Sequence, residues 1–236
     1  MGSLPPVRKN LLLVGASRGL GYAMTEEFLS RDWNVIGTVR GTARTRLHEL
    51  SDRSPGRIGI ETVDITMPDQ ISAMRSRLAA TTFDALFVNA GVTNNNPDET
   101  IGEVATEEFI RVMVTNALSP MRVLETLCDL VTADGLLGVM SSGQGSLANN
   151  TMGMREVYRG SKAALNMFMR SFAARHSADR RTMVLMAPGW VRTELGGPDA
   201  RLTIEESIPN VVNTLLAAQG KPGLHYLDYL GRPVPW

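Results

Sequence analysis

LLLVGASRGLG, residues 11–21, joins a short apolar run to a turn rich in glycine. Residues 11–14 have the composition of a buried strand, and residues 19–32 have the apolar spacing of a helix. Glycines at positions 15, 19 and 21 allow a strand to turn sharply into a helix and allow another group to approach the backbone. The stretch therefore predicts a strand–turn–helix unit of an α/β fold.

The rest of the chain repeats this alternation of strands and helices. Strand-like runs occupy residues 34–39, 58–63, 85–89, 136–140, 182–187 and 223–227. Helical patterns occupy residues 44–52, 67–80, 106–131, 158–176 and 203–219, the third of them disturbed near Ser119 and Pro120. Alternation with nearly continuous apolar strands predicts a Rossmann-type, doubly wound parallel sheet of about seven strands with helices on both faces. No linker divides residues 1–236, which we interpret as a single domain.

Composition excludes several classes of function. Lys plus Arg and Asp plus Glu number 24 each, so no net charge attracts nucleic acid or an anionic membrane. No apolar run approaches membrane-spanning length, and the first residues, MGSLPPVRKN, lack the apolar core of a signal peptide. Cys128 is the only cysteine and the three histidines are scattered, so neither an internal disulfide nor a metal site is expected. We predict a cytoplasmic protein.

The glycine-rich turn has two interpretations. It is either a tight turn alone or a cradle for the pyrophosphate of a dinucleotide at the start of a helix. An NAD-binding fold usually places a carboxylate after the second strand, where this chain has Arg40 and no acid before Glu49. Arg18 lies within the glycine turn, and two guanidinium groups suit a 2′-phosphate. We therefore expect NADP(H) to be preferred over NAD(H), the alternative being two solvated surface arginines.

Further polar residues follow the other strands, where an open α/β sheet binds its ligands. They are Asp64, the Asn89–Gly91 turn, Ser141, Ser142 and the segment PGWVRT at 188–193. Each of them alone is equally typical of an ordinary turn at a strand end. Tyr158 and Lys162 are four residues apart and hence neighbours on one helical face, where in isolation they would be a solvated surface pair.

Taken together and in order, these motifs resemble those of the short-chain dehydrogenase/reductase family. The order is G-x-x-x-G-x-G, a strand-end Asp, N-A-G, a helical Asn, S-S, Y-x-x-x-K and P-G-x-V-x-T, and it covers essentially the whole chain. MSSGQGS, VYRGSKAALNM, PGWVRTELGGPDA and YLDYLGRPVPW further resemble the branch that includes the C-factor signalling proteins and the carbonyl reductase called sniffer.

The resemblance implies a set of site residues. The catalytic residues would be Asn116, Ser142, Tyr158 and Lys162, with Asn116 holding a water that passes protons to Lys162. Val191 and Thr193 would meet the nicotinamide carboxamide and the cofactor phosphates. The cofactor-binding residues would be Gly15, Ser17, Arg18, Gly19, Leu20, Gly21, Arg40, Asp64, Ile65, Asn89, Ala90, Gly91, Tyr158, Lys162, Pro188, Gly189, Val191 and Thr193.

The chain departs from the family pattern at three places. The interval from Ser142 to Tyr158 is longer than in many members, so an insertion lies within residues 143–157 and the choice between Ser141 and Ser142 stays open. Val88 replaces the first Asn of N-N-A-G, and Val14 replaces the Thr that leads the glycine motif. The second replacement removes a hydroxyl that would stabilise the turn.

The residues suit the reduction of a carbonyl group. A phenol has a pKa of about 10, and an ammonium group about 4 Å away favours the phenolate by ~4 kcal/mol at an effective dielectric of roughly 20. Lys162 would thus tune Tyr158 as general acid and base, while Ser142 holds the carbonyl oxygen. No G-x-S-x-G elbow surrounds either serine, which disfavours a hydrolase.

We therefore predict an NADPH-dependent reductase of a small ketone or aldehyde, of the EC 1.1.1 type. Met152, Met154 and Trp190 lie in loops beside the predicted centre, which favours a hydrophobic substrate. Residues near 190–205 and the 143–157 insertion would shape its pocket. The alternative is a cofactor-binding signalling protein of the C-factor type with little or no turnover. Family members often pair their helices, so we also expect a homodimer or homotetramer.

Overall fold

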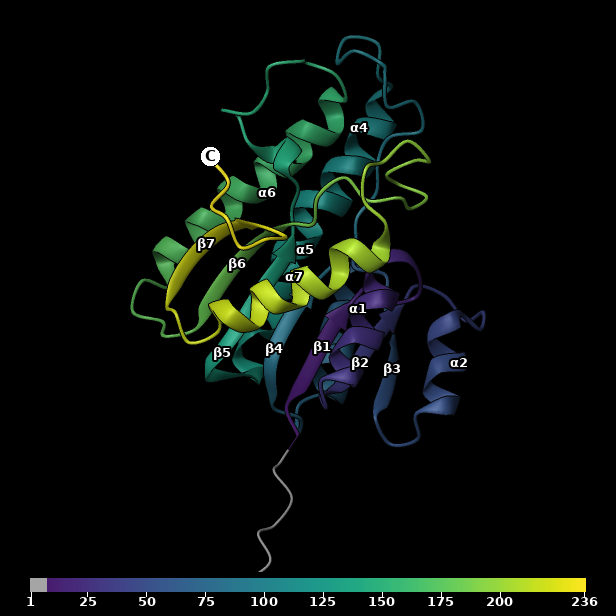
Figure 1. The fold of residues 1–236 in the computed structure, drawn as a ribbon, viewed down its shortest axis with the longest axis vertical. Coiled ribbons are helices and arrows are strands. Elements are labelled where there is room, and N and C mark those ends of the chain that lie inside the picture. The colour runs from purple at the N-terminus through teal and green to yellow at the C-terminus, as the bar shows by residue number, and fades with distance from the viewer. Residues whose placement is uncertain (1–7) are drawn as a thin grey trace, which may run out of the picture.

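The computed structural model describes residues 8–236, in which seven strands form one fully parallel sheet. The order across the sheet is β3-β2-β1-β4-β5-β6-β7 (Figure 1). This confirms the predicted Rossmann-type fold. The strands are β1 (Asn10–Val14), β2 (Asn34–Val39), β3 (Ile58–Thr62), β4 (Phe83–Val88), β5 (Val131–Met140), β6 (Thr182–Ala187) and β7 (Gly223–Asp228).

Helices cover both faces of the sheet, because almost every strand side chain is apolar and needs a partner on each side. One hydrophobic cluster joins the sheet to α3, α5 and α6, and a second joins it to α1, α2 and α7. Figure 1 shows α7 and α1 crossing the same face. The helices are α1 (Gly19–Ser30), α2 (Arg46–Arg53), α3 (Pro68–Arg77), α4 (Thr106–Met113), α5 (Ser119–Leu127), α6 (Glu156–Arg175) and α7 (Ile204–Ala218).

The predicted helix over 106–131 is three elements rather than one. After α4, residues Val114–Leu118 form a π-helical turn, and α5 then starts with Pro120 in its first turn, where a missing N–H is tolerated. A 3-10 turn over Cys128–Leu130 ends the helical part. The prediction of helix at Val131 is wrong, because Val131 begins β5 and pairs with Phe83.

The helix that carries Tyr158 starts two residues before it, at Glu156. Ser161, Leu165 and Phe172 of its predicted apolar face are fully buried, but Phe168 at the edge of that face is 45% exposed. Cys128 is partly buried, and burial raises the pKa of its thiol, in line with a packing role. The prediction that no signal peptide is present concerns the first ten residues. Residues 1–7 of that stretch lie outside the described residues.

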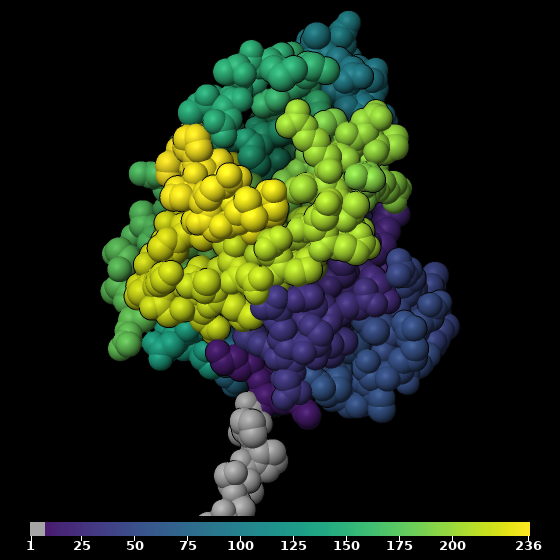
Figure 2. All heavy atoms as spheres, viewed as in Figure 1, coloured from purple at the N-terminus to yellow at the C-terminus, as the bar shows by residue number. Residues whose placement is uncertain are grey.

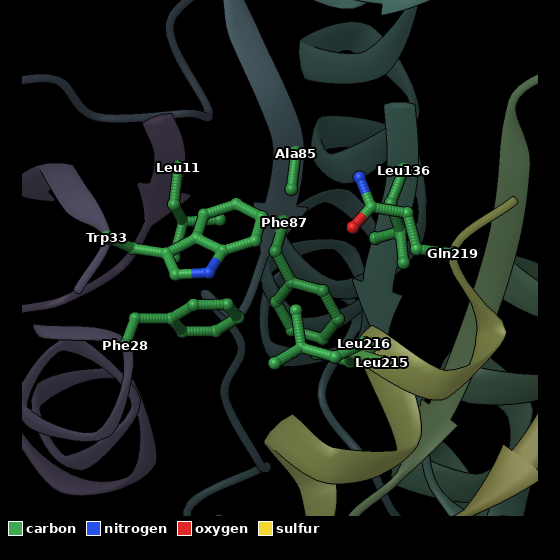
Figure 3. Close-up of a pocket in the computed structure, with 9 residues that line it drawn as sticks. All are labelled: Leu11, Phe28, Trp33, Ala85, Phe87, Leu136, Leu215, Leu216 and Gln219. Atoms are coloured by element: carbon green, nitrogen blue, oxygen red, sulfur yellow. The ribbon is translucent and has the colours of Figure 1, made fainter. Parts of the chain in front are cut away.

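A small apolar pocket lies between α1, α7 and the sheet (Figure 3). Phe28 and Trp33 meet edge to face there, with ring centroids 5.2 Å apart. Among the described residues, the lining is apolar apart from the Gln219 amide and the indole N–H of Trp33, and it contains no charged side chain. The pocket therefore offers no chemistry, and we interpret it as imperfect core packing.

The topology decides where a ligand would bind. β1 lies between β2 and β4, so the chain leaves β1 toward one half of the sheet and later returns to build the other half. The loops after β1 and β4 diverge at this switch point and leave a crevice beyond the carboxyl ends of the strands. Figure 2 shows a recess on this side, between the green segment around residue 150 and the lime segment around residue 195.

Candidate active site

The glycine-rich turn after β1 is packed against the turn after β4. Gly15 has φ of +91°, and a Cβ atom there would lie 2.8 Å from the backbone nitrogen of Ala90. A Cβ atom on Gly21 would lie only 1.9 Å from the carbonyl oxygen of Gly15. Asn89 Nδ2 donates a hydrogen bond of 2.8 Å to that same oxygen. Glycine is therefore required at positions 15 and 21 by the close approach of two loops.

A hydroxyl from the neighbouring strand supports this turn. The backbone N–H of Gly15 donates to Thr38 Oγ1 over 2.9 Å, and Thr38 is buried in β2. Val14 replaces the threonine that the family motif places in the turn, so the sequence indicated that a stabilising hydroxyl was lost. The structure instead provides one from β2.

The amino end of α1 has the properties of an anion-binding site. Arg18 precedes the helix in extended conformation with no side-chain cap, and the first turn contains no acidic residue. Ser17, Gly19 and Leu20 flank this end and are each partly buried. The first N–H groups of a helix lack internal partners, and its dipole favours negative charge there. A Cβ atom on Gly19 would meet nothing within 4 Å, so this open helix end fits a phosphate group.

The residues expected to surround an adenosine ribose lie beyond β1, β2 and β3. Arg40 follows β2 directly and is exposed. Arg18 forms a 2.6 Å ion pair with Glu194, and the two side chains are 73% and 76% exposed. Asp64 accepts from the backbone nitrogen and hydroxyl of Thr66, at 2.9 and 2.7 Å, through one carboxylate oxygen. Ile65 beside it is buried.

The π-helical turn places Asn116 in the interior, where its amide is saturated. Its Oδ1 accepts from the backbone nitrogen of Val92, and its Nδ2 donates to the Val92 carbonyl oxygen, each over 2.8 Å. The same Nδ2 donates to Ser161 Oγ over 2.9 Å. A fully buried amide needs all these partners. Asn116 therefore ties the loop after β4 to helix α6.

Lys162 is buried at the centre of the site. Its Nζ donates to the carbonyl oxygen of Met140 over 2.8 Å, and burial lowers the pKa of the ammonium to about 8. A Cβ atom on Gly91 would lie 3.3 Å from Asn116 Oδ1 and 3.4 Å from Lys162 Nζ. The Asn89–Gly91 turn, the π turn and α6 thus converge on one point.

Tyr158 is buried one helical turn before Lys162. Burial raises the pKa of its phenol, while a hydrogen bond with the Ser142 side chain and the charge of Arg155 act in the opposite direction. Ser142 Oγ accepts from the backbone nitrogen of Gln144 over 3.1 Å, which fixes this side chain at the end of β5. Ser142 and Tyr158 therefore face each other.

The expected effect of Lys162 on Tyr158 is not found. Lys162 Nζ lies 5.8 Å from the centroid of the Tyr158 ring and is bonded to a backbone carbonyl instead of the phenol. The pKa of Tyr158 is raised, and the cation that opposes this rise is Arg155. Burial outweighs nearby charge here, so Tyr158 keeps its proton at neutral pH.

The two adjacent serines have different environments. Ser141 is buried, and its hydroxyl donates to Asn166 Oδ1 over 2.6 Å. Asn166 Nδ2 in turn donates to the carbonyl oxygen of Gly145, over 3.2 Å. The side chain of Ser141 is thus committed to packing between β5 and α6.

The segment after β6 returns toward the glycine turn. Gly189 has φ of +87°, and the carbonyl oxygen of Pro188 accepts a 2.7 Å hydrogen bond from Ser207 in α7. Val191 is buried and bridges to Leu202. Thr193 Oγ1 accepts from the backbone nitrogen of Gly196 over 3.0 Å. Pro188, Gly189, Val191 and Thr193 therefore follow the carboxyl end of β6 directly.

Three residues of the site were not found from the sequence. The Tyr226 hydroxyl in β7 donates to the Ser142 carbonyl oxygen over 2.5 Å, Arg155 lies over the Tyr158 ring, and Glu194 pairs with Arg18. The contacts of Tyr226 and Glu194 join segments that are far apart in the sequence, so no local pattern predicts them. Arg155 is only three residues before Tyr158. A cation at that spacing was the one available signal.

Two features are absent from residues 8–236. No group of three or more His, Cys, Asp or Glu side chains in this part of the chain could hold a metal ion. Within the same range, no helix combines the length and the apolar character needed to cross a bilayer.

Comparison with known proteins identifies the family. The family model described as short chain dehydrogenase matches residues 9–201. The chain belongs to the short-chain dehydrogenase family. It is an oxidoreductase of the branch that resembles C-factor and sniffer. Its relatives include the C-signal protein of Myxococcus xanthus, which is 36% identical in sequence. That match covers 65% of this chain and 92% of the relative.

Solved structures of other short-chain dehydrogenases share the fold over nearly the whole chain. One from Burkholderia multivorans, assigned to this family and solved with bound NADP, is 64% identical with a TM-score of 0.96, covering 98% of this chain and 100% of that one. A carbonyl reductase from Pseudomonas aeruginosa PAO1, in complex with NADP, is 33% identical with a TM-score of 0.90, covering 98% and 100%. Two solved structures that share this fold therefore contain NADP.

Proposed function

We propose that this short-chain dehydrogenase reduces a hydrophobic ketone or aldehyde with NADPH. The observation that carries the proposal is the environment of Tyr158, whose phenol is buried, keeps its proton at neutral pH and is approached by the Ser142 side chain. This is the form that a proton donor to a carbonyl oxygen requires. The carbonyl reductase of Pseudomonas aeruginosa supports the same assignment by similarity.

The residues fit NADP(H) as the cofactor. The amino end of α1 is open at Gly19, where a Cβ atom would meet nothing within 4 Å, and this helix end favours a phosphate. We propose that Arg18 and Arg40 hold the 2′-phosphate, because guanidinium groups pair with phosphate in a bidentate fork. Pro188 through Thr193 would border the nicotinamide end. NADPH, when bound, supplies the hydride.

The chain's own groups would handle the proton. Ser142 Oγ holds the substrate oxygen, and the proton moves from the Tyr158 hydroxyl to that oxygen as negative charge develops on it. This leaves a buried phenolate one helical turn from the Lys162 ammonium, whose positive charge stabilises it. Lys162, whose pKa is about 8, then returns a proton to the phenolate and recovers one from solvent, through water near Asn116.

The loops around the recess favour an apolar substrate. Met152, Met154 and Trp190 are 74%, 54% and 45% exposed, on the 143–157 insertion and after β6. Exposed apolar side chains gathered at the mouth of a site gain free energy when a ligand covers them. We therefore propose that these loops, including the region 190–205, form the substrate pocket of a single domain.

A second candidate is a signalling protein that binds the cofactor with little turnover. The similarity to the C-signal protein of Myxococcus xanthus favours it. The two candidates are separated by a screen that follows NADPH oxidation with aliphatic and aromatic ketones, aldehydes and quinones. We expect steady turnover with at least one apolar carbonyl compound, whereas tight NADPH binding with no oxidation across the panel would favour the signalling protein.

A further inference from the structure

Arg155 lies at the site in a way that neither catalysis nor cofactor binding uses. It is the residue before α6, three positions before Tyr158, and its guanidinium carbon lies 5.3 Å from the centroid of the Tyr158 ring. Its Nη2 makes one long hydrogen bond, 3.4 Å, to Thr93 Oγ1 in the loop after β4. The guanidinium therefore lies on the wall of the site, between Tyr158 and the loop after β4.

This guanidinium lacks the partner that a partly buried cation needs. Its Nε is buried with no hydrogen-bond partner, and no carboxylate within residues 8–236 forms an ion pair with it. The carboxylates on the adjoining segments have other partners. Glu156 accepts from the backbone nitrogen of Ile101, and Glu108 pairs with Arg111. Buried charges are normally paired, so the missing partner points to a ligand.

The backbone supports the same conclusion. Arg155 has φ of +61° and ψ of 44°, the left-handed conformation that non-glycine residues other than Asn and Asp rarely adopt. Such strain persists where the surrounding structure holds it, and it is concentrated at functional sites. Asn or Gly would adopt this backbone conformation at a lower energetic cost than arginine. We therefore infer that the arginine side chain has a role at this position.

We propose that Arg155 binds a carboxylate on the substrate, so that the preferred substrate is an apolar oxo acid. A guanidinium presents two parallel N–H groups that match the two oxygens of a carboxylate, and the contact with the Tyr158 ring holds that fork in place. The exposed methionines of the same insertion would cover the apolar chain of the substrate. This inference rests on the proposed reductase function and names its substrate class.

The test compares matched charged and neutral compounds. Terminal methyl ketones bearing a carboxylate, from 4-oxopentanoate to 7-oxooctanoate, are each compared with the corresponding methyl ester in NADPH oxidation. For the unaltered protein we expect kcat/KM to be roughly 10- to 100-fold higher for at least one acid than for its ester, the range expected for a hydrogen-bonded ion pair. Equal values for acid and ester across the series would overturn the inference.

Variants assign the preference to one side chain. Arg155→Gln should abolish the preference for the acid through KM, so that acid and ester give similar kcat/KM, whereas Arg155→Lys should retain part of the preference. Arg159→Gln is the matched control, because Arg159 donates to the carbonyl oxygen of Met154. It should keep the full preference. A preference for the acid that survives in Arg155→Gln would overturn the assignment of carboxylate binding to Arg155. An equal loss of kcat for acid and ester would show that Arg155 acts on Tyr158 only.

A binding measurement separates this inference from the reductase proposal. Calorimetry with octanoate and octanamide, on protein saturated with NADP+, needs no turnover. Tighter binding of octanoate that Arg155→Gln removes would support the carboxylate site even if no ketone were reduced. Ketone reduction without any such difference would support the reductase and overturn the carboxylate site.

Discussion

The Ser141 hydroxyl donates a 2.6 Å hydrogen bond to Asn166 Oδ1, and it does so in the buried layer between β5 and α6. The side chain of the next residue, Ser142, instead approaches the Tyr158 phenol and opposes the rise in its pKa. One of two adjacent hydroxyls thus holds the framework together, while the other faces the site. Ser141 therefore contributes to the stability of the fold, and we propose that Ser142 contributes to catalysis.

Replacing each serine by alanine should therefore give opposite results. Ser142→Ala should lower kcat by about 10²–10³, the cost of removing one donor to a developing oxyanion, with little change in stability. Ser141→Ala should lower the free energy of unfolding by about 1–3 kcal/mol, because it leaves the buried Asn166 oxygen unpaired. Steady-state kinetics and urea unfolding measure both. A Ser141→Ala variant that loses most turnover while Ser142→Ala keeps it would reverse the assignment.

The cofactor preference should depend on the arginine after β2. In the unaltered protein we expect a lower dissociation constant for NADPH than for NADH, because we propose that Arg18 and Arg40 bind the 2′-phosphate. Arg40→Asp should shift the preference toward NADH, since the carboxylate repels phosphate and accepts from a ribose hydroxyl. Fluorescence titration gives all four constants. Equal constants for both cofactors in the unaltered protein would show the assignment to be wrong.

Glu194 provides an independent control on the same site. Its carboxylate forms an ion pair with Arg18, the residue that we propose binds the 2′-phosphate. Glu194→Gln should therefore tighten NADPH binding by a few-fold, in keeping with the ~0–1 kcal/mol of an exposed ion pair, and leave NADH binding unchanged. The gain should shrink as salt is added.

Much of this site was predictable because its constraints are local. Gly21 is imposed by a backbone contact within one turn, and Tyr158 and Lys162 by the helical repeat, whereas Gly15 is imposed by its contact with Ala90 in another loop. The helix predicted through Val131 failed because a short apolar run does not distinguish a helix end from a strand start. Thr38 and Tyr226 act across the sheet, through contacts that depend on the strand order and that no local pattern encodes.

The buried ammonium of Lys162 should make stability depend on pH. Burial lowers its pKa to about 8, below the unfolded value of 10.5, so the folded state binds fewer protons between these two pH values. The free energy of unfolding contributed by Lys162 therefore rises with pH across this window. Relative to Lys162→Met, the ligand-free protein should gain about 2 kcal/mol between pH 8 and pH 10. Urea unfolding at both pH values measures it, and a constant difference would contradict the buried charge.

The helical face around α4 and α6 should mediate self-association. Five exposed apolar side chains lie on α4, the neighbouring π turn and α6, and a patch of this kind usually has a partner. They are Phe109, Ile110, Leu118, Met167 and Phe168. Light scattering should give two or four times the chain mass of 25.7 kDa. Phe168→Glu should shift the mass toward one chain, and Met67→Glu, on exposed Met67 before α3, should not. A single chain mass for the unaltered protein at micromolar concentration would contradict the proposal.

The central claim is that Tyr158 donates the proton in carbonyl reduction, and Tyr158→Phe tests it most directly. The substitution keeps the buried ring and removes only the hydroxyl, so folding and NADPH affinity should stay within a few-fold of the unaltered protein. The kcat for NADPH oxidation with the best carbonyl substrate should fall by about 10²–10⁴, the range for a positioned general acid. Turnover close to that of the unaltered protein would contradict the account and leave Tyr158 and Lys162 as a structural pair.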